Sequence, residues 1–313
     1  MIGFIVRRIA SAIPVVLGVT ILVFLILHLI PGNPAQILLF GSNPTSAQLA
    51  RLTRELGLDK PLPVQYWHYL TGLVHGNLGR SYLNNQTVAS EIGSRLPSTL
   101  ILTAAAMGVG CLIGIPVGIV AGLRPNTWFD RAATGFAVLG TSIPYFWFAL
   151  VLIIVFAVSL GWLPSLGIGS PQAIILPACS LGWSLAAIIA RLLRNALVDT
   201  YLQPYMLVAR AKGLSERRML VRHAAKNSLI PVVTVLGLQF GNLLVGAVAI
   251  EVIFGRSGLG TYLASAIQAK DIPTVQGIVL VIALAYIVLN LIIDLVYTFL
   301  DPRIRRQWSA AGG

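Results

Sequence analysis

The stretch Tyr205–Pro231, YMLVARAKGLSERRMLVRHAAKNSLIP, concentrates positive charge in a chain that is otherwise very apolar. Gly213 interrupts it after ARAK, and Ser215 can then form half of a helix cap, because a capping-box Glu is missing. From Ser215 onward, apolar residues recur at three- and four-residue spacing, opposite a basic face. This pattern predicts a short basic amphipathic helix after a glycine hinge. The basic face of this helix could bind acidic membrane lipid or a protein partner. The face consists of Arg217, Arg218, Arg222 and Lys226.

The composition indicates a membrane protein. Hydrophobic residues make up 57% of the 313 positions and charged residues only 10%, whereas a soluble domain carries about a quarter charged residues. The net charge of +12 lies between apolar spans and not on one soluble face, which argues against nucleic-acid binding. Cys111 and Cys179 both lie in apolar runs, so neither a disulfide framework nor a metal site is expected.

Six apolar spans are long enough to cross a bilayer as helices, at about 20 residues or more each. We read the first as a retained helix and not a signal peptide, because no small-residue cleavage site follows it. The sequence therefore predicts an all-α polytopic membrane protein with six transmembrane helices. The spans are Ile9–Ile30, Leu100–Leu123, Ala132–Leu160, Ala173–Leu193, Val232–Ile250 and Val275–Leu300.

The distribution of lysine and arginine predicts the orientation. Most of the 22 basic residues fall in the two termini and in the short loops that share their side of the membrane. Short loops rich in Lys and Arg remain in the cytoplasm, while long loops cross with little regard to charge. Both termini and the basic stretch are thus expected inside, and residues 31–97 outside.

The long outside segment has helical patterns of its own. We expect three short helices: one with Leu49, Leu52 and Leu56 on a face, one opened by Pro63, and one closed by Pro97. Between the last two lies GNLGRS, residues 76–81, which we interpret as an ordinary glycine turn.

The spans contain small and polar residues whose roles can be weighed. Gly108, Gly110, Gly114 and Gly118 form a stripe that predicts close helix packing. Pro144, in SIPYFW, predicts a kink lined by aromatic side chains that either pack the bundle or border a pathway.

Glu251, Asn290 and Asp294 are candidates for structural pairing or for a pathway. An acid inside a span usually faces protein. We expect Asp294 to pair with Arg191 or Arg194, as a salt bridge within the bundle.

ARAKGLSERR followed by RHAAKNSLIPVVTVLG resembles the cytoplasmic coupling loop of dipeptide, oligopeptide and nickel-type ABC importer permeases. GNLGRS and EVIFGRSGLG are similar to two further elements of that family, with Asn for Asp in the first and Arg256-Ser257 for Trp-Pro in the second. The wider importer signature has Glu and Ala where this chain has Leu207 and Val208. The resemblance covers nearly the whole chain.

The resemblance implies a type I ABC importer permease fold and a loop that docks into a groove on an ATP-binding subunit. It implies a complex with a second homologous permease, two ATP-binding subunits and an extracytoplasmic substrate-binding protein. The transported solute remains open among dipeptide, oligopeptide, glutathione, nickel chelate and sugar. The residues assigned to coupling are Ala209, Arg210, Ala211, Lys212, Gly213, Leu214, Arg217, Arg218, Arg222 and His223.

No GxxxxGK[ST] loop is present, so ATP hydrolysis would belong to other subunits and no cofactor is expected. Two other classes of function would need features of their own. An intramembrane serine protease would use GRSG at residues 255–258 with His28 as base. A secondary transporter would require inverted halves and midplane ligands, and the spans show no such symmetry.

The predicted organisation has four parts in the cytoplasmic (inner) membrane of a bacterial-type cell. An N-terminal tail and first helix, 1–30, precede the extracytoplasmic helical segment, 31–97. A five-helix permease core, 98–300, carries the coupling loop at 201–231, and a cytoplasmic tail, 301–313, ends the chain.

Overall fold

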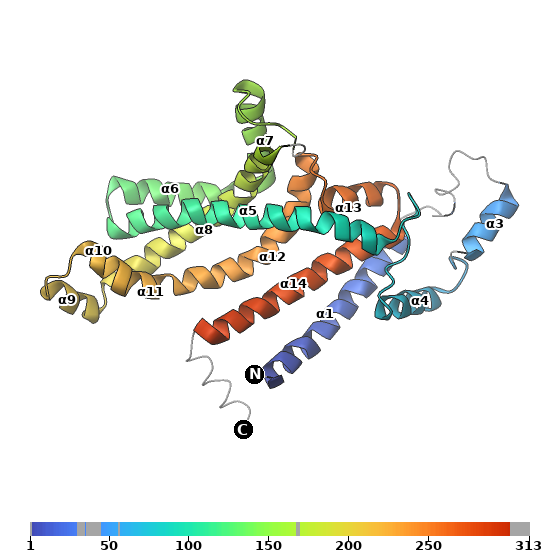
Figure 1. The fold of residues 1–313 in the computed structure, drawn as a ribbon, viewed down its shortest axis with the longest axis horizontal. Helices are drawn as coiled ribbons and strands as arrows, with labels where there is room; N and C mark the ends of the chain where they lie inside the picture. Colours follow the sequence, from blue (N-terminus) through green and yellow to red (C-terminus); the bar gives the residue numbers. More distant parts are fainter. Residues whose placement is uncertain (1, 30–34, 36–44, 56, 167–169, 301–313) are drawn as a thin grey trace. The chain divides into compact units, whose positions relative to one another are not determined.

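The computed structural model describes residues 2–29, 35, 45–55, 57–166 and 170–300, without the side chains of residues 2–9, 27, 29, 226 and 293–300. In this part of the chain the regular structure is helical (Figure 1), and one isolated antiparallel bridge joins Arg80 and Thr87. The all-α prediction is confirmed for these residues.

The chain divides into two compact units. Unit 1 comprises Met1–Ser98 and Ser257–Leu291, and unit 2 comprises Thr99–Arg256 and Ile292–Gly313. The helices α5 and α14 continue from one unit into the other. Unit 1 contains α1 (Ile2–Leu29), α3 (Ser46–Glu55), α4 (Leu62–Val74), the start of α5 (Val88–Leu123), α13 (Leu259–Gln268) and most of α14 (Ile272–Leu300).

Unit 2 contains the rest of α5 and the helices that follow it. These are α6 (Trp128–Ser142), α7 (Tyr145–Leu152) with a π-helical extension (Ile153–Ser159), a 3₁₀ turn (Pro171–Ile174), α8 (Ile175–Tyr201), α9 (Pro204–Ala211), α10 (Glu216–Met219), a π-helical turn (Leu220–Ala224), α11 (Ala225–Ser228) and α12 (Ile230–Ile253).

Several helices are long and apolar enough to cross a membrane. Among the described residues four qualify alone: Val88–Leu123, Pro171–Tyr201, Ile230–Ile253 and Ile272–Ile292. A fifth span arises if α6 and the α7 segment are counted together, and the apolar part of α1, Ala10–Ile26, is shorter. The chain is therefore an all-helical polytopic membrane protein.

The predicted third span, Ala132–Leu160, is not one continuous helix. α6 and α7 meet at an angle of 105°. Ile143 has extended geometry, with φ −84° and ψ 120°, because the ring of Pro144 disfavours helical geometry in the residue before it. The predicted kink is thus a full break in the helix.

Pro97 was predicted to close a short helix, and that prediction is wrong. α5 runs without interruption from Val88 to Leu123, through both Pro97 and Pro116. A proline inside a helix costs about 3 kcal/mol, because it removes a backbone hydrogen bond and its ring clashes with the carbonyl of residue i−4. Continuing the helix buries residues such as Leu102 and Ala106 in the core of unit 2, which favours the longer helix.

The glycine stripe of α5 packs against α8, as predicted for three of its four members. A Cβ on Gly114 would lie 2.6 Å from the Ala186 carbonyl oxygen, and one on Gly118 would lie 2.8 Å from that of Ala190. Gly110 likewise faces Leu185, whereas a Cβ on Gly108 would meet nothing within 4 Å. The two helices therefore approach closely enough for only glycine to fit at these positions.

The GNLGRS turn of unit 1 is more than an ordinary turn. The Ser81 hydroxyl donates to Asp271 Oδ2 at 2.5 Å, and the Tyr82 backbone N–H donates to Oδ1 at 3.0 Å. The Thr274 hydroxyl donates to the same carboxylate at 2.7 Å, and Asp271 is fully buried. The turn is thereby fastened to the start of α14.

Candidate functional site: the basic segment at residues 201–231

The first helix of the basic segment ends in a Schellman motif. Gly213 adopts φ +74°, its N–H donates to the Arg210 carbonyl at 3.0 Å, and the Leu214 N–H donates to the Ala209 carbonyl at 3.3 Å. This pair of bonds defines the motif, and the left-handed residue within it is ordinarily glycine. The predicted glycine hinge is therefore confirmed as a reversal between α9 and α10 (Figure 1).

One face of the segment belongs to the core of unit 2. Met206, Ala209, Met219 and Ala224 are buried in it, and Leu214 packs against it. The basic side chains occupy the other face, where Arg210, Lys212, Arg217, Arg218 and Arg222 are all exposed. The predicted amphipathic pattern is confirmed, although a π-helical turn at Leu220–Ala224 interrupts its regular period.

Apolar side chains are exposed beside these cations, which the sequence reasoning missed. Leu202, Leu207, Val208 and Val221 are each at least half exposed, Leu202 to 74%. Leu207 and Val208 had been noted only as departures from the wider importer signature. A surface that mixes apolar and basic side chains is suited to a protein partner, because buried apolar area contributes to binding while charges orient the encounter.

Three side-chain hydrogen bonds fasten the segment to α8 and to itself. The Thr200 and Ser228 hydroxyls lie 3.1 Å apart, and the Ser228 hydroxyl also lies 3.2 Å from the Ala196 carbonyl oxygen, to which it can donate. Asn227 donates to the Tyr205 hydroxyl at 2.9 Å. The segment is thus held beside α8, and its two ends are held to each other. The only sequence signal for these residues was the polar Asn-Ser pair after the basic helix.

The remaining polar contacts of the segment are weak. Arg210 and Glu216 lie 3.6 Å apart, and both side chains are largely exposed, where such pairs contribute little. Ser215 occupies the N-cap position of α10 but makes no side-chain cap hydrogen bond, so the half of the cap predicted for it is not formed. His223 is half-buried, and the side chain of Lys226 lies outside the described residues.

The three polar candidates in the spans differ in their surroundings. Glu251 is fully buried in α12. Asn290 donates to the Tyr286 carbonyl of its own helix at 2.9 Å, which satisfies it locally. The side chain of Asp294 lies outside the described residues.

Arg194, one of the two partners expected for Asp294, binds a different carboxylate. Its Nε and Nη2 donate to Asp130 Oδ1 and Oδ2 at 2.9 and 2.7 Å, a bidentate pair between α8 and the first turn of α6. Asp130 also accepts from the Asn126 backbone N–H. The sequence pointed to Asp294, an acid within the sixth span, whereas the fold pairs Arg194 with Asp130, 64 residues earlier in the chain.

The protease interpretation does not fit the surroundings of His28. Its Nδ1 lies 2.7 Å from the Phe24 carbonyl oxygen and its Nε2 lies 3.1 Å from Gln65 Oε1. Both ring nitrogens therefore already face acceptors on α1 and α4. A general base for Ser257 would need one of them free to take its proton.

The described residues form several membrane-length helices and a basic segment fastened to α8. These features fit a membrane subunit of the transport type. The family described as "Binding-protein-dependent transport system inner membrane component" matches residues 114–306. The N-terminal family of the same membrane component matches residues 1–103. The chain belongs to the binding-protein-dependent transport system inner-membrane component family.

Relatives of known name match over almost the full length. The chain is 41% identical over 305 residues to the glutathione transport system permease protein GsiC of Salmonella typhimurium LT2, covering 97% of this chain and 99% of the relative. It is 41% identical over 306 residues to GsiC of Escherichia coli K12, with the same coverage.

Two solved structures share the fold. An inward-facing MetNI methionine ABC transporter chain gives a TM-score of 0.53 at 19% identity, covering 67% of this chain and 96% of that one. A chain of an amino acid ABC transporter solved with histidines gives 0.52 at 19% identity, covering 69% and 94%. These likenesses support an ABC-permease-like fold.

The chain is a permease subunit of a binding-protein-dependent ABC importer, a multi-pass protein of the bacterial inner membrane. It is the non-catalytic membrane component, and it acts with ATPase and binding-protein partners.

Proposed function

We propose that this chain is one of two homologous permeases in an importer for small peptides, with glutathione as a substrate. The observation that carries the proposal is the 41% identity to glutathione permeases over 97% of the chain. A second permease and two ATP-binding subunits would complete the membrane complex. The binding protein would deliver the peptide from outside.

The proposed topology has six transmembrane helices with both termini in the cytoplasm. α1 would be the first span, since its 28 residues, Ile2–Leu29, reach about 42 Å at 1.5 Å per residue. The bent pair α6–α7 would be the third. Residues 1–30, 31–97, 98–300 and 301–313 would then be the N-terminal tail with the first helix, the extracytoplasmic segment, the permease core and the cytoplasmic tail. The lysine and arginine distribution supports this orientation.

The basic segment is proposed to dock into a groove on an ATPase subunit. Its exposed basic and apolar side chains fit a protein groove, where buried apolar area adds to affinity and charges orient the encounter. Closure of the ATPase subunits would push the segment, and the Thr200–Ser228 and Asn227–Tyr205 bonds would carry the movement to α8. The proposed docking residues are Ala209, Arg210, Ala211, Lys212, Gly213, Leu214, Arg217, Arg218, Arg222 and His223.

Reconstitution tests the function directly. The full complex is placed in proteoliposomes with ATP inside and the binding protein outside, and uptake of labelled glutathione, a dipeptide, an oligopeptide, a nickel chelate and a sugar is compared. We expect glutathione uptake that requires ATP, the binding protein and this permease. Uptake of the sugar or the nickel chelate alone, with none of any peptide, would overturn the proposal.

A further inference from the structure

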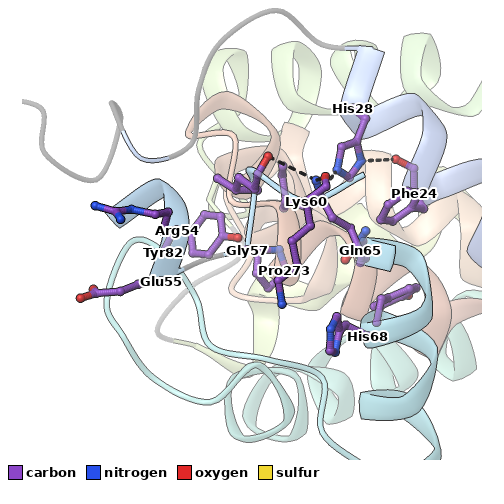
Figure 2. A pocket seen from close by; sticks show the side chains of 14 residues that line it. Phe24, His28, Arg54, Glu55, Gly57, Lys60, Gln65, His68, Tyr82 and Pro273 are labelled. Carbon is purple, nitrogen blue, oxygen red and sulfur yellow. Dashed lines mark hydrogen bonds between the residues drawn. The ribbon is translucent and has the colours of Figure 1, made fainter. Parts of the chain in front are cut away.

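Unit 1 contains a cavity of about 390 Å³ that neither coupling nor membrane insertion explains. Its walls come from α1, the end of α3, the loop after it, α4, Tyr82 and the first turns of α14. The volume lies in the range of pockets that bind small molecules, roughly 300–1,000 Å³. Figure 2 shows Lys60 near the middle of its labelled side chains, between Tyr82 and Gln65.

A hydrogen-bond network holds the frame of this cavity. Gln65 faces His28 through its Oε1, at 3.1 Å. Through its Nε2 it donates to the Lys60 carbonyl at 2.7 Å and to the Leu58 carbonyl at 3.3 Å. α1, α4 and the loop that carries Lys60 are therefore fixed to one another (Figure 2). Such a frame is organised before any ligand arrives.

Four polar groups inside this frame have unused hydrogen-bonding capacity. Gln276 lines the cavity with only 7% of its surface exposed, yet no described residue accepts from or donates to its side-chain amide. The same holds, among the described residues, for the Lys60 ammonium and for the phenol hydroxyls of Tyr69 and Tyr82. The polar atoms of these four residues are not among the fully buried ones, and Lys60 is an exposed residue. They are therefore open to the cavity, where a ligand can form hydrogen bonds with them in place of water.

These groups select an anionic ligand rich in acceptors. Lys60 carries a positive charge, and Arg54 adds another where it lines the cavity. Burial raises the pKa of Tyr69 to about 12, and burial together with the Asp271 carboxylate raises the pKa of Tyr82 to about 12. Both phenols therefore remain donors at neutral pH.

The one carboxylate that lines the cavity does not cancel this preference. Glu55 accepts a hydrogen bond from Arg51 at 2.8 Å, outside the cavity. The Gln276 amide can both donate and accept, which suits a peptide group beside a carboxylate.

We propose that this cavity is a second solute site, which binds a short peptide through its free carboxylate on the extracytoplasmic side. The inference rests on the proposed function, because it uses the orientation and the peptide substrate. The permease itself would then have a solute site on unit 1. This site is formed by Lys60, Gln276, Tyr69 and Tyr82.

The test is binding to the complete permease–ATPase complex in phosphatidylcholine nanodiscs, without the binding protein. Saturation-transfer NMR titrations with glutathione and with its diamide, in which both carboxylates are blocked, give the dissociation constants. We expect glutathione to bind, and the diamide to bind about tenfold more weakly, the usual effect of losing a hydrogen bond to a charged group.

Two variants and a matched control locate the site. Lys60→Gln and Gln276→Leu should each weaken glutathione binding about tenfold. Arg80→Gln, which removes an exposed cation of unit 1 that does not line the cavity, should leave it unchanged. Gln276→Leu should keep the thermal stability of the complex, because the Gln276 amide makes no hydrogen bond with a described residue and Leu has a similar size.

Several results would overturn the proposal. These are no glutathione binding, equal binding of the diamide, or unaltered binding by both variants. Displacement of the peptide by phosphatidylglycerol in the nanodisc would assign the site to lipid headgroups and would also overturn it. In each case glutathione uptake in proteoliposomes would still support the proposed function, whereas failure of all peptide uptake would reject that function whatever the NMR shows.

Discussion

At the scale of single residues, two positions combine a special geometry with a defined consequence. Gly213 is left-handed, at φ +74°, and a Cβ there would meet nothing within 4 Å. Asp271 is fully buried and accepts from Ser81, Tyr82 and Thr274. The backbone conformation alone restricts which residue fits at position 213. At Asp271 the three hydrogen-bond donors impose the restriction.

Gly213→Val should uncouple transport from ATP hydrolysis while the protein still inserts into the membrane. The cost is backbone strain of about 1–2 kcal/mol in the left-handed region, without a steric clash. The ratio of glutathione imported to ATP hydrolysed in proteoliposomes measures the effect. Gly213→Asn is the matched control, because Asn tolerates this geometry. A wild-type ratio for the Val variant would show that the reversal at Gly213 does not matter for coupling.

Asp271→Ala should destabilise unit 1 by about 2–4 kcal/mol, because it leaves buried hydroxyls and the Tyr82 N–H without an acceptor. The midpoint of thermal unfolding in detergent should fall accordingly. Asp59→Ala removes an exposed acid and serves as the control. Equal unfolding midpoints for the two variants would mean that the GNLGRS turn does not depend on this carboxylate.

At the scale of elements, the short helices α9 and α10 depend on their neighbours. An isolated helix of four to eight residues is unstable in water. These helices persist because Met206 and Met219 are buried in the core of unit 2 and because Ser228 and Asn227 fasten the segment. Their exposed arginines are thereby held in a fixed arrangement, which lipid would not require.

Replacing Arg217, Arg218 and Arg222 together by Lys should weaken co-purification of the ATPase subunits in detergent. Lys keeps the charge but cannot form the planar bidentate bonds that Arg makes with carboxylates. Reversal to Glu should abolish co-purification. Unchanged retention of the ATPase by the triple Lys variant would indicate that this basic face binds lipid. Docking to the ATPase would then depend on the apolar side chains.

At the scale of the whole molecule, the proposed orientation places the basic segment and the GNLGRS turn on opposite sides of the membrane. The charge distribution along the sequence supports this arrangement. It would put the cavity of unit 1 where peptide arrives, and the segment at 201–231 where ATP is hydrolysed. Both proposals therefore depend on topology, which can be measured separately.

Single cysteines at Asn84 and Ser215, both exposed positions, report the topology in a background with Cys111 and Cys179 replaced by Ala. In spheroplasts an impermeant maleimide should label Asn84→Cys at once. Ser215→Cys should react only after permeabilisation, because the membrane shields it. The reverse pattern would invert the proposed orientation.

The sequence by itself determined the helical class, the long apolar helices, the glycine reversal and the division of the basic segment into two faces. These features follow from composition and from three- and four-residue periods, which are local properties. Only the tertiary structure decided that Arg194 binds Asp130, that Asp271 holds Ser81 across 190 residues, and that Gln276 and Lys60 line one cavity. It also decided that the helix continues through Pro97. Each of these outcomes depends on which distant groups can satisfy a buried polar atom or cover an apolar face, and local sequence carries no record of that.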